Sequence, residues 1–80
     1  MAKTLNELTK AFDVDNFFDY ICKQWLAGNE SYALNLFDSM RPADKKDFMN
    51  ELNHGTFMQK MGDGPWQMEF LREIIYSLNI

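Results

Sequence analysis

The sequence has one cysteine, Cys22, and one histidine, His54. A single cysteine cannot form an internal disulfide, and a secreted domain of 80 residues usually needs several bridges or a metal to supplement its small core. One Cys and one His also cannot provide the four nitrogen and sulfur ligands of a structural zinc site. These shortages favour a reducing, cytoplasmic setting and predict neither a metal site nor a cofactor.

Long apolar runs are missing too. No stretch approaches the roughly 18 apolar residues that span a bilayer, and residues 1–4 lead straight into polar positions, without the apolar stretch of a signal peptide. We therefore expect neither a membrane partner nor export. From Met1 to Ile80 the chain carries no visible tag, and we expect a complete small gene product.

Positive charge is scarce. Eight Lys and Arg residues stand against twelve Asp and Glu residues, for a net charge of −4. Nucleic-acid-binding domains normally carry a basic stripe, whereas the cationic cluster here, Arg41, Lys45 and Lys46, is interleaved with Asp44 and Asp47. The alternative function that stays open is a helix-turn-helix-like DNA-binding regulator, acting as a dimer that doubles this weak positive face.

Apolar residues, in contrast, are numerous enough for a core. They make up 46% of the chain, which is ordinary or better for a globular protein and too much for a disordered one. The four Gly and two Pro residues all fall between segments of helical periodicity, and no alternating strand pattern extends beyond a few residues. The sequence predicts an all-α fold: one small domain, residues 1–80, built as a bundle of about five short amphipathic helices.

Capping residues mark the first two helix starts. Thr4 and Glu7 have the spacing of a capping box, which predicts a short helix at about 5–12. Asp13 or Asp15 is expected to cap the helix that follows. Helices of this length are not stable alone in water, so tertiary packing must hold them together.

Gly and Pro mark the later boundaries. Gly28 follows the last periodic residue of the second helix and is expected to close it in a left-handed conformation, with Asn29 or Ser31 capping the third helix. Pro42 and Pro65 are expected to open two further helices, because proline loses no hydrogen bond at the first helical position.

The apolar faces of these helices define a predicted core. Its members recur at the three- and four-residue spacing of a helix face. They are Phe17, Ile21, Trp25, Leu36, Phe37, Phe48, Leu52, Phe70, Ile74 and Leu78.

Catalytic and metal-binding arrangements find little support in the sequence. A Cys22–His54 nucleophile pair is formally available, but Cys22 lies beside core positions, where a thiol is usually inert. The acidic run from Asp13 to Asp19 resembles the opening of a calcium loop, yet the position that requires glycine is Phe18. The turn at residues 62–66 has no lysine and no preceding strand, so it does not resemble a phosphate loop. We expect no catalytic residues and no small-molecule substrate.

Aromatic and methionine residues exceed what a core of this size can bury, and both types are enriched at protein interfaces. The segment 56–68 combines a short turn of helix with a Gly-rich loop, and we expect it to present a partner-binding surface. The alternative interpretation is that this loop folds back over the bundle. The predicted partner-binding residues are Phe57, Met58, Met61, Asp63 and Trp66.

The function that these patterns favour is binding without catalysis. We expect a small acidic helical protein that covers a surface of a partner protein and modulates it by occupancy, most simply as an inhibitor. Chains of this size and charge are common among phage and mobile-element accessory proteins that act on host machinery, including defence nucleases. The apolar C-terminus, with Leu78 and Ile80, leaves a homodimer open.

Overall fold

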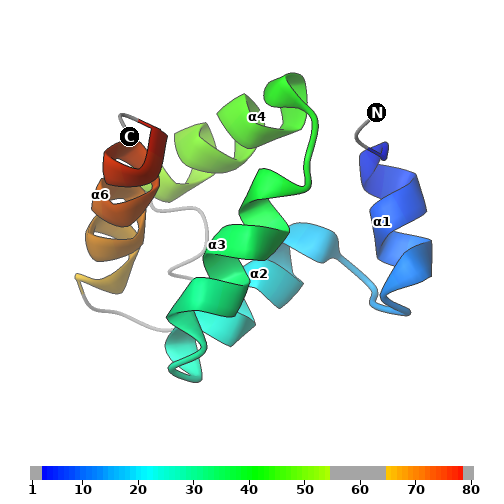
Figure 1. The fold of residues 1–80 in the computed structure, drawn as a ribbon, viewed down its shortest axis with the longest axis horizontal. Helices are drawn as coiled ribbons and strands as arrows, with labels where there is room; N and C mark the ends of the chain where they lie inside the picture. Colours follow the sequence, from blue (N-terminus) through cyan, green and yellow to red (C-terminus); the bar gives the residue numbers. More distant parts are fainter. Residues whose placement is uncertain (1–2, 55–64, 79–80) are drawn as a thin grey trace.

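Helices make up most of the described chain, as Figure 1 shows. The structure is a computed structural model that describes residues 3–54 and 65–78. No strand occurs within these ranges, where an isolated parallel bridge pairs Lys3 with Met40. The predicted all-α class is confirmed. The helices are α1 (Leu5–Ala11), α2 (Phe17–Leu26), α3 (Glu30–Asp38), α4 (Pro42–Asn53) and α6 (Trp66–Leu78).

The N-terminus of α1 forms the predicted capping box. The Glu7 amide donates to Thr4 Oγ1 over 3.2 Å, and the Thr4 amide donates to Glu7 Oε1 over 2.8 Å. Two amides that would otherwise lack partners at the helix start are satisfied in this way. The hydrogen bond from the Thr4 amide, followed by the interaction of the carboxyl with the Thr4 hydroxyl, lowers the pKa of the Glu7 carboxyl below its ordinary value of 4.5, because both favour its charged form.

The start of α2 differs from the prediction. Asn16, and neither Asp13 nor Asp15, caps this helix, with its Oδ1 accepting from the Asp19 amide over 3.2 Å. Asp13 has a φ of 53°, a left-handed conformation that short polar side chains tolerate. Both aspartates therefore belong to the connection between α1 and α2.

Gly28 closes α2 as predicted, with a φ of 91°. Asn29 stands at the N-cap position of α3, but its side chain makes no capping bond and donates instead to Gln24 Oε1 over 2.9 Å. Ser31 lies inside α3. The predicted side-chain cap of this helix is therefore wrong, because Asn29 bonds back to the helix that it follows.

Both prolines occupy the expected places. Pro42 is the first residue of α4, and Pro65 directly precedes α6, accepting from the Glu69 amide over 3.1 Å. The short helical turn predicted between Phe57 and Met61 lies outside the described residues.

The core contains every predicted member whose side chain is described, Leu78 being the one that is not. It also holds seven buried apolar residues that are not among the predicted core members. These are Leu8, Phe18, Cys22, Ala33, Met40, Trp66 and Leu71.

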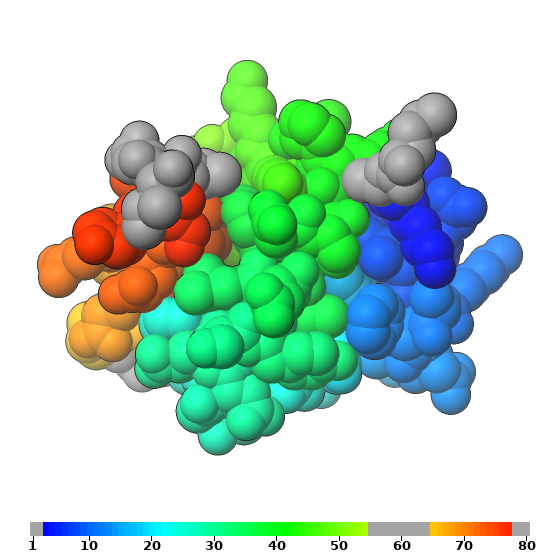
Figure 2. Space-filling model, in the orientation of Figure 1, coloured from blue at the N-terminus to red at the C-terminus, as the bar shows by residue number. Residues whose placement is uncertain are grey.

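The helices form two packed groups. Helix α1 packs on α2 and α2 on α3, while α4 packs on α6. Figures 1 and 2 show α1 and α6 at opposite ends of the longest axis, in a molecule measuring 32 × 30 × 22 Å. The two ends therefore offer separate surfaces to solvent.

Candidate protein-binding surface

The segment predicted to present a binding surface is only partly described. Phe57, Met58, Met61 and Asp63 lie outside the described residues. Trp66 is described, and it is 7% exposed among the core residues at the start of α6. Trp66 is therefore not an exposed residue that could anchor a partner. For this residue the alternative interpretation, burial against the bundle, is correct.

The cations of the alternative, DNA-binding function lie close to carboxylates. Arg41 Nε lies 3.2 Å from Asp44 Oδ2, and Lys45 Nζ lies 3.2 Å from Asp38 Oδ1. Lys45 also sits over the Phe37 ring, with Nζ 5.9 Å from its centroid. Two of the three candidate cations are thus neutralised within the protein, which weakens a phosphate-binding face.

Cys22 and His54 do not form a nucleophile pair. The Cys22 side chain is fully buried, and burial, followed by the charges of Asp19 and Glu51, raises the pKa of its thiol far above the ordinary 9.0. His54 is exposed at the end of α4, with Nδ1 2.8 Å from the Asn50 carbonyl oxygen of its own helix. A buried thiol that stays protonated is a poor nucleophile.

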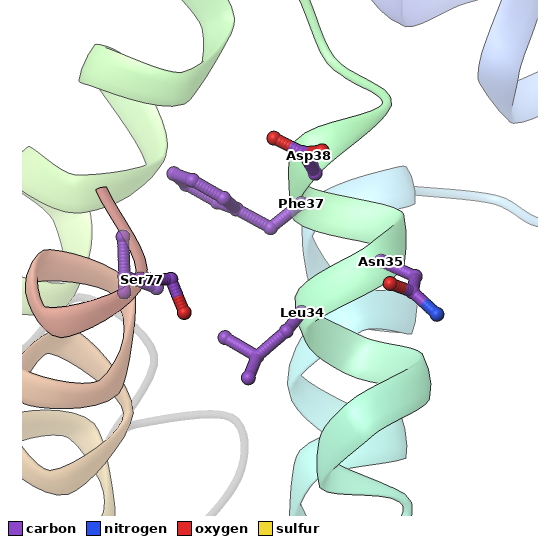
Figure 3. A pocket seen from close by; sticks show the side chains of 6 residues that line it. Leu34, Asn35, Phe37, Asp38 and Ser77 are labelled. Atoms are coloured by element: carbon purple, nitrogen blue, oxygen red, sulfur yellow. The ribbon is translucent and has the colours of Figure 1, made fainter. Parts of the chain in front are cut away.

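A cleft separates α3 from α6. Figure 3 shows the side chains of Leu34 and Phe37 reaching from α3 towards Ser77 of α6. The cleft has a volume of about 190 Å³. Asp38, Ile74 and Asn35 complete its wall, and Figure 3 shows the Asn35 side chain pointing away from Ser77. The cleft has few convergent polar groups, whereas small-molecule sites use several to fix a ligand's orientation.

Aromatic rings form a row across the first three helices. The centroids of Phe12 and Tyr20 are 5.8 Å apart, and Tyr20 meets Tyr32 edge-on at 6.4 Å. Phe17 lies beneath, 5.4 Å from Phe12 and 6.4 Å from Tyr20. Phe12 follows α1, Tyr20 belongs to α2 and Tyr32 to α3. We call Phe12, Tyr20 and Tyr32 the aromatic row.

The aromatic row is both accessible and fixed. Phe12 is 37% exposed and Tyr32 is 41% exposed, while Tyr20 is half-buried between them. The hydroxyls of Tyr20 and Tyr32 are hydrogen-bonded over 3.1 Å, which raises the pKa of Tyr20 above its ordinary 10.0. Ring contacts and this hydrogen bond hold the side chains in place before any partner arrives.

Carboxylates surround a hollow beside the aromatic row. The hollow has a volume of about 310 Å³, and its wall carries Asp13, Asp15 and Asp19, with Tyr20 shared between the row and the hollow. Lys23 is the one cation in this wall. Within the described part of the chain, no three His, Cys, Asp or Glu side chains converge as metal ligands, so these carboxylates do not form a metal cage.

The local sequence explains why acid and aromatic residues meet here. The left-handed backbone of Asp13 turns the chain just after Phe12, and the Asn16 cap then starts α2 with Phe17 facing the core. Asp15 is left on the exposed connection. The acidic run was visible in the sequence, but its link to Tyr32 depends on the packing of α2 on α3.

Neither a protein-family model, nor a curated protein, nor a solved structure matches this chain. In the residues that the structure describes, no helix combines the length and the apolar character needed to cross a membrane. Inference about function therefore rests on the chemistry of the surfaces described above.

Proposed function

We propose that this protein acts without catalysis, by docking the aromatic row and the adjacent carboxylates onto a basic surface of a partner protein. Occupying that surface would keep the partner's own ligand away, so the protein acts as an inhibitor. The observation that carries the proposal is the contact of Tyr20 with Tyr32 beside the hollow lined by Asp13 and Asp15.

The aromatic side of the proposal rests on rigidity. Tyrosine and other aromatic side chains are enriched among residues that contribute most to protein interfaces. Phe12 and Tyr32 are partly exposed yet held by neighbouring rings, so little side-chain entropy remains to be lost on binding. Two preordered anchors can therefore contribute strongly to affinity from a small area.

The charge of the surface indicates the kind of partner. Asp13, Asp15 and Asp19 face one hollow, and the whole chain carries a net charge of −4. Such a surface attracts basic surfaces and speeds the encounter with them. Proteins that process nucleic acids carry basic surfaces of this kind. We therefore propose a cytoplasmic nucleic-acid-processing protein as the partner, such as a nuclease targeted by a phage or mobile-element accessory protein.

The DNA-binding alternative has weaker support. It requires several unopposed cations on one face, and Arg41 and Lys45 are paired with Asp44 and Asp38. Lys46 is exposed and stays available. One cation provides a small salt-dependent affinity, so we retain this function as the second hypothesis.

The test is capture of partners from host lysate on immobilised protein, after nuclease treatment. We expect the wild type to retain a stoichiometric protein, and Tyr32→Ala and Asp15→Lys each to lower its affinity by about tenfold or more. Leu26→Ala and Asp47→Lys are matched controls, because both residues are exposed away from the row and the hollow.

Two outcomes would contradict the proposal. Equal losses for Asp15→Lys and Asp47→Lys would show that only net charge matters, since each change moves the net charge from −4 to −2. Recovery of nucleic acid when nuclease is omitted, released as salt rises and abolished by Lys46→Glu, would favour the DNA-binding alternative.

A further inference from the structure

Two tyrosines meet where α2 packs on α3. The hydroxyl oxygens of Tyr20 and Tyr32 lie 3.1 Å apart, although the two residues are 12 positions apart in the sequence. Their ring centroids are 6.4 Å apart, with the ring planes at 90°. Because the oxygens are much closer than the centroids, the rings converge at their hydroxyl ends. The ortho carbons, which adjoin the hydroxyl-bearing carbon of each ring, therefore flank the point of closest approach.

This tyrosine pair is open to an oxidant from solvent. Tyr32 is 41% exposed, and Tyr20 is half-buried beside it. Other side chains that give up an electron readily are better covered, since both tryptophans are 7% exposed and Cys22 is fully buried. The third tyrosine of the chain, Tyr76, is 66% exposed on α6 and takes no part in the pair.

We propose that Tyr20 and Tyr32 form a site of oxidative crosslinking, at which hydrogen peroxide and a haem peroxidase join the two rings through a carbon–carbon bond. The product is a dityrosine within one chain. It links α2 to α3 across the turn at Gly28.

The reaction removes two hydrogen atoms from the protein. Each phenol gives up one electron and its hydroxyl proton, which leaves a phenoxyl radical with unpaired electron density on its ortho carbons. The two radicals form a bond between one ortho carbon of each ring. The hydrogens on these two carbons then leave as protons, and the two oxygens take up protons and become hydroxyls again. Hydrogen peroxide accepts the two electrons and two protons, its O–O bond breaks, and two water molecules form.

The fold favours this coupling by proximity. Tyrosyl radicals on separate molecules must meet by diffusion, whereas Tyr20 and Tyr32 are already in contact, so their coupling does not depend on protein concentration. A covalent link between the two residues also closes a loop in the unfolded chain, which lowers the entropy of that state. The site does not rest on the proposed function, because the reaction needs no partner protein.

Three variants with two tyrosines each test the site, because the chain has three tyrosines. Tyr76→Phe keeps the pair, whereas Tyr20→Phe and Tyr32→Phe are matched controls that each leave one member of the pair together with Tyr76. Phenylalanine retains the ring but has no hydroxyl hydrogen to lose. Circular dichroism establishes that each variant is folded before oxidation.

Each variant is treated with a haem peroxidase and hydrogen peroxide at low protein concentration. The product that keeps the mass of one chain, 9.5 kDa, is then separated from covalent dimers. We expect the monomeric product of Tyr76→Phe to have lost two hydrogen atoms by mass spectrometry. We also expect its dityrosine fluorescence to exceed that of the two control variants by about tenfold or more.

Urea unfolding measures the consequence for the fold. Oxidised Tyr76→Phe is expected to unfold at a higher urea concentration than the untreated variant, because the link restricts its unfolded state. Tyr32→Phe, treated in the same way, is expected to keep its midpoint.

Equal dityrosine fluorescence in the monomeric products of all three variants would overturn the proposal, since coupling would then not depend on the contact between Tyr20 and Tyr32. Dityrosine confined to covalent dimers would overturn it as well. An oxidised Tyr76→Phe that unfolds at the same or a lower urea concentration would show that the link does not lock α2 to α3. None of these measurements includes a partner, so the proposed function is tested independently.

Discussion

Trp25 of α2 lies flat against Phe70 of α6, with ring centroids 4.3 Å apart and ring planes 7° from parallel. Phe70 in turn meets Phe48 of α4 edge-on at 5.6 Å. The Phe70 ring therefore joins three helices that are distant in the sequence. Because these contacts join α2 to the packed pair α4 and α6, we expect the stability of the whole fold to depend on this ring.

Replacing Phe70 by alanine tests this dependence. The change removes a fully buried ring and its contacts with Trp25 and Phe48, so we expect the free energy of unfolding to fall by about 3–5 kcal/mol. Urea unfolding followed by far-UV circular dichroism measures it. Tyr76→Ala removes an exposed ring from the same helix and is expected to cost about 0.5 kcal/mol or less. Similar losses for the two variants would contradict a central role for Phe70.

Local patterns predicted most of this fold. Helix starts at Pro42 and after Pro65, and the helix end at Gly28, follow from backbone restrictions that hold in any context. The cap of α2 was missed because several neighbouring polar residues can cap a helix. The choice of Asn16 depends on where Phe17 must point to reach the core, which is a tertiary constraint.

The candidate binding surface was harder to predict from the sequence than the fold was. Phe12, Tyr20 and Tyr32 lie on or beside three different helices, so no single periodicity relates them. Their meeting requires the packing of α1 and α3 on α2. Trp66 illustrates the reverse error: its residue type is common at interfaces, but composition cannot tell a buried tryptophan from an exposed one.

Gly28 allows a test of backbone strain without steric complication. Its φ is 91°, and a Cβ added there would meet nothing within 4 Å. We expect Gly28→Ala to lower the free energy of unfolding by about 1–2 kcal/mol, since an L residue is strained in this conformation. A chemically synthesised chain with D-alanine at this position is the control, and we expect it to be at least as stable as the wild type. If both alanines are equally destabilising, the strain argument is wrong.

Gln67 carries a buried side-chain amide. The residue is only 2% exposed, and neither Nε2 nor Oε1 has a hydrogen-bond partner among the residues that the structure describes. We expect Gln67→Met to raise the free energy of unfolding by about 1–2 kcal/mol, because methionine of similar shape leaves no polar group unsatisfied.

Urea unfolding of Gln67→Met is compared with that of Gln24→Met. Gln24 accepts a hydrogen bond from Asn29 over 2.9 Å and is half-buried, so the same substitution there should not stabilise the protein. Should Gln67→Met instead destabilise the protein as much as Gln24→Met does, the amide at position 67 contributes to the fold after all.

The capping box makes α1 sensitive to acid. Hydrogen bonds with Thr4 lower the pKa of Glu7 from 4.5, so the folded state binds the Glu7 proton less readily than the unfolded state. The stabilisation is therefore fully present above a pH of about 4.5 and is lost as the pH falls through the lower pKa of the folded state. NMR titration of the Glu7 carboxyl and the Thr4 amide is expected to show one shared transition below pH 4.5.

Glu7→Gln separates this titration from those of the other carboxylates. A glutamine can still accept the hydrogen bond from the Thr4 amide, but it does not titrate. We expect the stability advantage of the wild type over Glu7→Gln to shrink as the pH falls through the Glu7 transition, and the Thr4 amide shift to lose its pH dependence in the variant. A Glu7 carboxyl that titrates at or above pH 4.5 would show that the capping box does not favour the charged form.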